Sequence, residues 1–141
     1  PVLFEGLGRR HEKDAGLSQA AGLKLWRAAE LSDHQKLSQV LAQRMLRNAA
    51  MEMEMAADLA ARLKQYSRAS ELWAKSAQIT DQLVIWKQEL TSKATVITFY
   101  QQGSAAKWYQ SALMALLDED DGFAVEAKLK SDKRWVLLPA D

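Results

Sequence analysis

The stretch that decides the fold runs from Ser67 to Lys93 and reads SRASELWAKSAQITDQLVIWKQELTSK. Apolar or small residues recur in it at alternating steps of three and four, and charged or amide side chains fall mainly between them. Because an α-helix turns once every 3.6 residues, this spacing places the apolar set on one face. We therefore predict an amphipathic helix with a buried stripe of Ala69, Leu72, Ser76, Ile79, Leu83, Trp86 and Leu90.

The preceding half of the chain also has apolar residues at helical spacing. A helix is expected after Gly16, and Ser32 stands three residues before Gln35 in a capping-box pattern, which predicts a second helix from about Asp33. The second helix either continues to about residue 63 or breaks near Asn48. Residues 65–67 are expected to turn into the central helix, whereas residues 1–8 give no clear preference.

The residue types and their spacing change after Lys93. Residues 95–100 are β-branched and aromatic and predict a strand, residues 101–104 predict a turn, and residues 105–117 predict another helix, which the acidic run 118–121 and Gly122 end. Apolar and polar residues then alternate over 123–130. With a turn at residues 131–133 and a return strand at 134–138, this end of the chain is predicted to be a β-hairpin.

These elements predict a mainly α fold of the α+β class. Two helical hairpins would pack through their apolar stripes within residues 1–94, and residues 95–141 would form a small strand, helix and β-hairpin tail in the same domain. A helix followed by a basic hairpin is also how a winged helix closes. A chain of 141 residues is long enough for one domain with its own core.

Composition limits the class of protein. With 48% hydrophobic and 26% charged residues, the chain is expected to be a soluble globular protein without a membrane-spanning segment. It contains no cysteine, which excludes disulfides, thiol nucleophiles and cysteine-ligated zinc and favours a cytoplasmic location. The net charge of +1 gives no overall preference for nucleic acid, so a basic surface would have to be local.

A short pattern repeats along the chain. When Trp26 is aligned with Trp73, a small residue, a Leu, the Trp and another small residue recur at one spacing. Around the second copy, the sequence has an alanine-rich helix, Tyr66 three residues before Ala69, the pair Leu72 and Trp73, and a later Trp86. This arrangement resembles the PerC and ANR families of small bacterial transcriptional regulators.

The resemblance covers about forty residues per copy, and Ala94 stands where the family pattern has a cysteine. It implies gene regulation through contact with DNA or with a DNA-binding protein. The same residues also suit a tetratricopeptide-like hairpin, whose role is to bind a peptide or a protein partner.

No pattern for catalysis or metal binding stands out. The histidines, His11 and His34, have no carboxylate at a metal-ligand spacing beside them. Glu52, Glu54 and Asp58 are better explained as charges on a helix surface. We therefore expect a non-enzymatic protein without a metal or a small-molecule cofactor.

The candidate binding residues are cationic or aromatic. Cations around the predicted hairpin turn, with one on the preceding helix, could contact phosphate as a wing does. Tryptophan can serve partner binding, although the spacing of Trp26 and Trp73 suits a core better. The DNA-binding candidates are Lys128, Lys130, Lys133, Arg134 and Lys107, and the partner-binding candidates are Trp26, Trp73, Trp108 and Trp135.

The sequence thus predicts a bacterial transcriptional regulator or a regulator-binding accessory protein, whose partner is DNA or a DNA-binding protein. The alternative is a helical-repeat adaptor or chaperone that binds a protein partner and makes no contact with DNA. The even spacing of the central stripe also suits pairing between two chains, so a homodimer is an open alternative.

Overall fold

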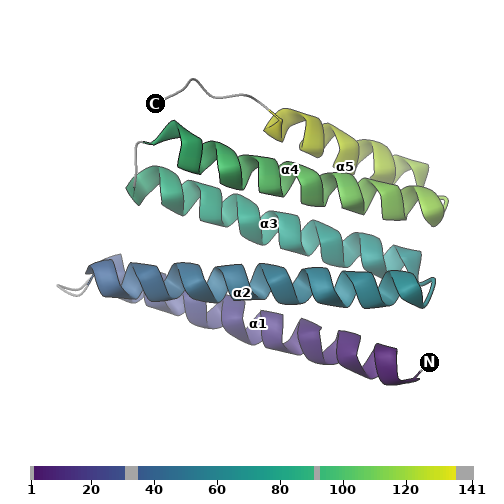
Figure 1. Cartoon of the computed structure of the whole chain (residues 1–141), viewed down its shortest axis with the longest axis horizontal. Coiled ribbons are helices and arrows are strands. Elements are labelled where there is room, and N and C mark those ends of the chain that lie inside the picture. Colours follow the sequence, from purple (N-terminus) through teal and green to yellow (C-terminus); the bar gives the residue numbers. More distant parts are fainter. Residues whose placement is uncertain (1, 31–34, 91–92, 136–141) are drawn as a thin grey trace.

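The structure, a computed structural model, describes residues 2–30, 35–90 and 93–135. Within these ranges the chain forms five α-helices and no strand. In chain order they are α1 (Val2–Glu30), α2 (Gln35–Arg62), α3 (Tyr66–Leu90), α4 (Ala94–Leu117) and α5 (Asp121–Arg134). The helices lie side by side in chain order and form an elongated stack (Figure 1).

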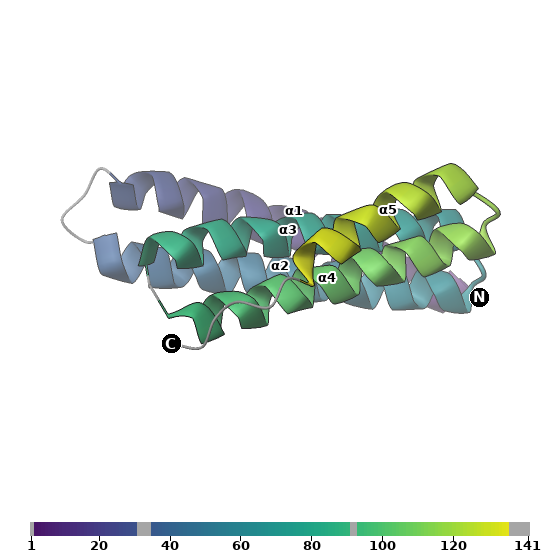
Figure 2. The ribbon, with the colours of Figure 1, turned by 90° about the horizontal axis from the view of Figure 1, so that it is seen from above.

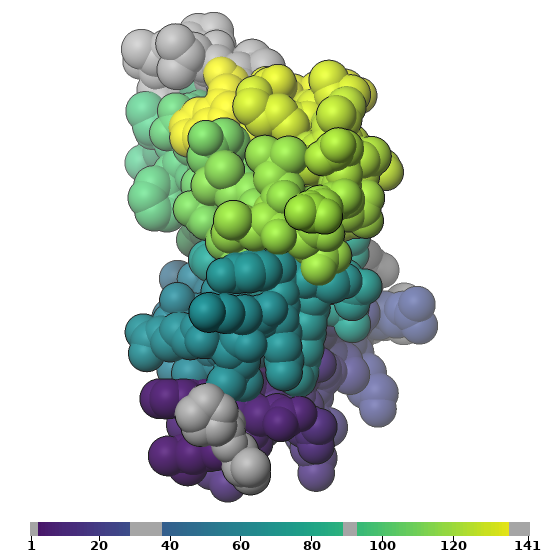
Figure 3. Space-filling model, turned by 90° about the vertical axis from the view of Figure 1, so that its right-hand side faces the viewer, coloured from purple at the N-terminus to yellow at the C-terminus, as the bar shows by residue number. Residues whose placement is uncertain are grey.

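Each helix from α3 onward contacts the two helices before it. α3 packs along α2 and also reaches α1, where the rings of Trp26 and Trp86 stack with centroids 3.9 Å apart. α5 packs along α4 and also reaches α3 through an ion pair between Arg134 and Asp81. Two layers result, and in Figure 2 the C-terminal half of α1 and the helix α5 lie to one side of the stack while α2 and α4 lie to the other. The end view in Figure 3 shows the order from α1 in purple to α5 in yellow.

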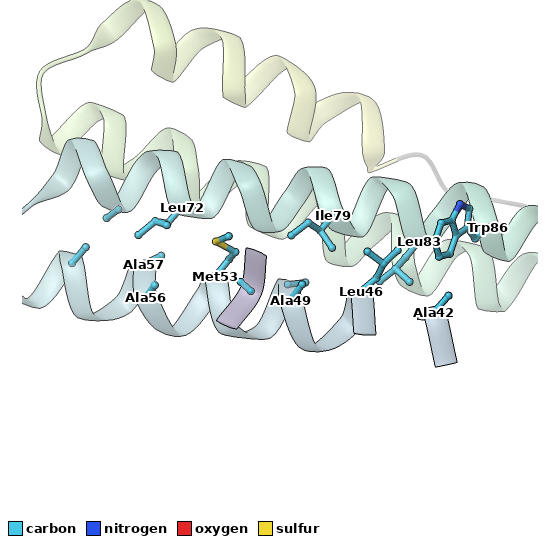
Figure 4. Packing of buried hydrophobic residues seen from close by; sticks show 14 of the residues in the cluster. Ala42, Leu46, Ala49, Met53, Ala56, Ala57, Leu72, Ile79, Leu83 and Trp86 are labelled. Atoms are coloured by element: carbon cyan, nitrogen blue, oxygen red, sulfur yellow. The ribbon is translucent and has the colours of Figure 1, made fainter. Parts of the chain in front are cut away.

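The predicted stripe of the central helix is confirmed. Every stripe residue of α3 from Ala69 to Trp86 is at most 5% exposed, while the side chain of Leu90 lies outside the described residues. The stripe packs against an alanine-rich face of α2, as Figure 4 shows. The seam therefore joins helices of one chain. Its largest fully buried side chains are Leu46, Ile79 and Leu83.

α2 settles an alternative that the sequence left open, because it continues without a break past Asn48 to Arg62. Its expected start near Asp33 and the Ser32 capping pattern lie outside the described residues. α2 ends in a left-handed residue, Lys64, with φ of 60°. The amide of Gln65 donates to the Ala60 carbonyl at 2.9 Å, and this Schellman closure turns the chain into α3.

Serine side chains join the helices of the stack. The hydroxyl groups of Ser70 and Ser111 each donate to the other residue's backbone carbonyl at 2.8 Å, which ties α3 to α4. Ser76 donates to the Ala50 carbonyl of α2 at 2.9 Å, and Ser131 of α5 donates to a carbonyl of α4. Small side chains with satisfied hydroxyl groups let the helix backbones approach closely without burying an unpaired polar atom.

The predicted C-terminal β-hairpin is wrong, and with it the α+β class and the winged-helix closure. Residues 121–134 form α5, which Asp120 caps by accepting a hydrogen bond from the Phe123 amide at 3.1 Å. The alternation of apolar residues over 123–130 coincides with a second, helical spacing of small residues, Ala124, Ala127 and Ser131, and these are the buried ones. The predicted turn at 131–133 lies inside the helix, and most of the predicted return strand, residues 136–138, lies outside the described residues.

The predicted strand at 95–100 and the turn at 101–104 are also wrong, since both belong to the first turns of α4. Burial of a helical stripe that runs from Ser104 through Trp108 to Ala115 outweighs the β propensity of residues 95–100. The predicted end of this helix at the acidic run is confirmed, because α4 stops at Leu117. The turn there has Glu119 in the left-handed region, and Gly122 lies within α5.

Candidate functional site

A groove of about 670 Å³ opens where α2, α3 and α4 meet. The residue that follows α5, Trp135, lines one side of it. Because the walls come from the middle of α2, the second half of α3 and the first half of α4, the groove depends on the helix stack and on no single element. The remaining lining residues are Arg47, Asn48, Ala50, Met51, Glu54, Thr80, Leu83, Phe99, Tyr100, Gln102, Gly103 and Lys107.

Large apolar side chains stand exposed around this groove. Phe99 is 72% exposed, Met51 56% and Trp135 49%. Tyr100 lies beside Phe99 in an edge-to-face arrangement, with ring centroids 5.4 Å apart. Apolar side chains that gather at a hollow, and are not scattered singly, are typical of an interaction surface.

The groove also carries charge. The ammonium group of Lys107 lies 3.3 Å from a carboxylate oxygen of Glu54 and donates a hydrogen bond to the Thr80 hydroxyl at 2.6 Å, so this cation is already neutralised. Arg47, by contrast, is exposed, and no carboxylate of the described residues lies within ion-pair distance of it. The groove therefore offers one unpaired guanidinium group beside its apolar side chains.

The structure does not gather the predicted DNA-binding cations into a wing. Lys128 and Lys130 lie on α5 and pair with carboxylates of the same helix, Asp132 at 2.5 Å and Glu126 at 3.5 Å. Arg134 is half-buried in its ion pair with α3, and Lys133 is exposed. The fifth candidate, Lys107, lies in the groove on a different helix.

Two of the four candidate tryptophans are buried inside the stack, and a third is partly buried against its core. Trp26 is 8% exposed and stacks on Trp86, Trp73 packs against the same core, and Trp108 is 3% exposed. The indole nitrogen of Trp108 donates to Asp81 at 3.2 Å. Trp135 is the candidate that remains at an open surface, and it is the one that lines the groove.

Sequence reasoning missed the other groove residues. Phe99 is predicted in a strand, and neither Met51 nor Arg47 is among the candidate binding residues. The available signal was position on the helix: Met51 and Phe99 are large apolar residues that fall outside the buried stripes of their helices. For Phe99 that signal appears only when residues 95–100 are taken as a helix.

Nothing in the described residues suggests a metal centre, since no group of three or more histidine or acidic side chains converges there. His11 of α1 pairs with Glu52 of α2 and Glu12 with Arg68 of α3, and both contacts join helices. His34 lies outside the described residues. None of the described helices is both long enough and apolar enough to cross a membrane.

Comparison of the chain with protein-family models, with curated proteins and with solved structures gives no match.

Proposed function

We propose that this chain is a non-enzymatic adaptor of the cytoplasm that holds a segment of a partner protein in the groove between α2, α3 and α4. The observation that carries the proposal is the exposure of Met51, Phe99 and Trp135 around one hollow of about 670 Å³. Extended stacks of helices commonly use such grooves to bind peptides or helices.

The groove defines the chemistry of its partner. The apolar side chains require a segment with large apolar residues, and the unpaired guanidinium group of Arg47 favours a carboxylate next to them. Lys107 contributes little to selectivity because Glu54 already neutralises it. We therefore propose a partner segment in which apolar residues adjoin an aspartate or a glutamate.

The residues that resemble PerC and ANR regulators support a regulatory version of this proposal, in which the partner is a DNA-binding protein. Direct contact with DNA has less support. Lys128, Lys130 and Arg134 are engaged by carboxylates of the chain itself, and a phosphate would have to compete with these ion pairs.

The proposal is tested by selecting binders from a library of short random peptides displayed on phage. We expect the selected peptides to combine large apolar residues with an acidic residue, and we expect Phe99→Ala to weaken their binding by about tenfold or more, equivalent to about 1.4 kcal/mol. Arg47→Glu should weaken the binding of the acidic peptides and leave the binding of their amide analogues unchanged. Leu17→Ala is the matched control, because Leu17 is 63% exposed on α1, away from the groove.

If the selected peptides bind the Phe99 and Arg47 variants as well as the unmodified protein, the groove is not the binding site. Direct DNA binding is measured separately with a labelled duplex at low and high salt. Retention that weakens steeply with salt, and that falls when Lys130 and Lys133 are both replaced by Ala, would favour the DNA-contacting regulator instead.

A further inference from the structure

A second apolar surface lies at the far end of the stack, on the side of the α4–α5 pair that faces away from α3. It contains a hollow of about 340 Å³. Its floor is formed by Ala112 and Ala124, each 4% exposed. We call this surface the terminal face, and its large apolar members are Tyr109, Leu113, Leu116, Val125 and Leu129.

The terminal face is the position where a further helix of the stack would lie. α3 covers the pair α1 and α2, and α5 in turn contacts the pair α3 and α4. In the part of the chain that the structure describes, no helix follows α5 to cover α4 and α5 in the same way. As a consequence, Tyr109 is 42% exposed, Leu116 54%, Val125 60% and Leu129 55%.

A second copy of the chain can supply the missing helices. It carries the same pair of open helices with the same apolar side chains, and two such pairs placed face to face form a four-helix arrangement about a twofold axis. The partial exposure of these side chains leaves on the order of 400 Å² of apolar surface on each copy, in the range of the largest patches on soluble monomers. A standard interface buries about 800 Å² on each partner, and about 65% of a homodimer interface is apolar. The terminal face therefore supplies most of the apolar area that a homodimer interface of this size requires.

Charge does not oppose this pairing. Around the terminal face, Lys128 pairs with Asp132 and Lys130 with Glu126 on the same helix. The exposed acidic run 118–121 lies at one end of the face, and an antiparallel pairing of the two copies keeps the two runs apart. The net charge of the whole chain is +1, and two copies therefore repel each other only weakly.

We propose that the chain forms a homodimer in which the terminal faces of two copies pack against each other. The proposal does not depend on the α2–α3–α4 groove, because the groove uses residues 99–107 of α4 whereas the terminal face uses residues 109–116 of that helix together with α5. Sedimentation of the full chain over a range of concentrations should show a monomer–dimer equilibrium that reaches twice the monomer mass of 15.8 kDa.

Leu129→Glu tests the face directly, because it places a carboxylate in the proposed interface while keeping a good helix former. We expect the dissociation constant to rise at least tenfold while helix content and melting temperature at low concentration stay unchanged. Leu17→Glu, at an equally exposed position on α1, should leave the dimer intact. A strict monomer at every concentration overturns the proposal, as does a dimer that Leu129→Glu and Val125→Glu both leave unchanged.

The absence of cysteine permits a second measurement on the same face. A single cysteine introduced by Leu129→Cys should cross-link two copies under mild oxidation, whereas Leu17→Cys should cross-link far more slowly. Equal rates for the two variants would mean that the copies meet only by random collision, and would reject the terminal face as the interface.

Discussion

Replacing Asp81 with Asn is expected to loosen α5 from the rest of the stack. The Asp81 carboxylate accepts hydrogen bonds from Nε and Nη2 of Arg134, each at 2.8 Å, and from the indole of Trp108 at 3.2 Å. It also accepts from the Ser104 hydroxyl. One carboxylate on α3 thereby holds two side chains of α4 and one of α5.

The magnitude follows from burial and charge. Asn has nearly the shape of Asp, but it carries no charge, and its amide NH2 group replaces one of the two oxygens, so one guanidinium N–H loses its acceptor. Hydrogen bonds to charged groups contribute about 1.5–3 kcal/mol each, and breaking a fully buried ion pair costs about 3–5 kcal/mol. Both side chains here are 27% exposed, which lowers the expected loss to about 2–3 kcal/mol, or roughly 6–12 °C in melting temperature for a chain of this size.

Urea and thermal unfolding followed by circular dichroism measure this loss, and amide hydrogen exchange locates it. Protection should fall most in α5 and least in α2. Asp132→Asn is the control, because it removes an exposed ion pair with Lys128 within α5, and such pairs contribute about 0.3–0.5 kcal/mol. If the Asp81 variant lost no more stability than the Asp132 variant, or lost protection evenly along the chain, the carboxylate would not be what fixes α5.

Four further substitutions test the packing of the helices and the turn between α4 and α5. Leu83→Ala should lower the free energy of unfolding, measured in urea, by about 2–5 kcal/mol, because Leu83 is 2% exposed and its truncation leaves a cavity. A loss below about 0.5 kcal/mol would place Leu83 at the surface. Gly16→Ala should stabilise the protein by about 0.5–1 kcal/mol, because nothing lies within 4 Å of the added Cβ. Gly22→Ala should add less stability, because its Cβ would meet the Ala42 carbonyl oxygen at 3.1 Å. Equal gains in the free energy of unfolding would contradict the close approach of α1 to α2. Glu119→Gly should raise the melting temperature, because Glu119 has a left-handed φ of 61° that glycine adopts without steric cost. The expected gain in the free energy of unfolding is about 1 kcal/mol. An unchanged melting curve would disprove it.

The central helix could be predicted from the sequence because its stripe has one period and no competing pattern. α5 could not, because its residues satisfy two periods at once: apolar residues alternate along it, while small residues recur at helical spacing. The alternation over residues 123–130 has the period of a strand, and this pattern alone predicts a hairpin. The structure buries the small residues because Trp108 of α4 already fills the space against which α5 packs.

Turn chemistry added to the error. The acidic run 118–121 and Gly122 are together predicted to end α4, but the left-handed position is occupied by Glu119, Asp120 caps α5, and Gly122 lies within α5. A left-handed position occupied by glutamate cannot be recognised from the sequence, because glycine is the residue that normally marks such positions. The groove could not be predicted for another reason: its members come from three helices, and Arg47 and Phe99 line one hollow only after α2, α3 and α4 have packed.

The order of packing along the stack has a kinetic consequence. Since each helix docks on the two that precede it, most tertiary contacts join segments that are close in the chain, and proteins with such local contacts fold quickly. During synthesis, α1 and α2 can pair as soon as they leave the ribosome, and α3 can dock before α4 is made. The stacking of Trp86 on Trp26 closes the first three helices into one unit, so the fluorescence of these two rings would report that step separately from the later arrival of α5.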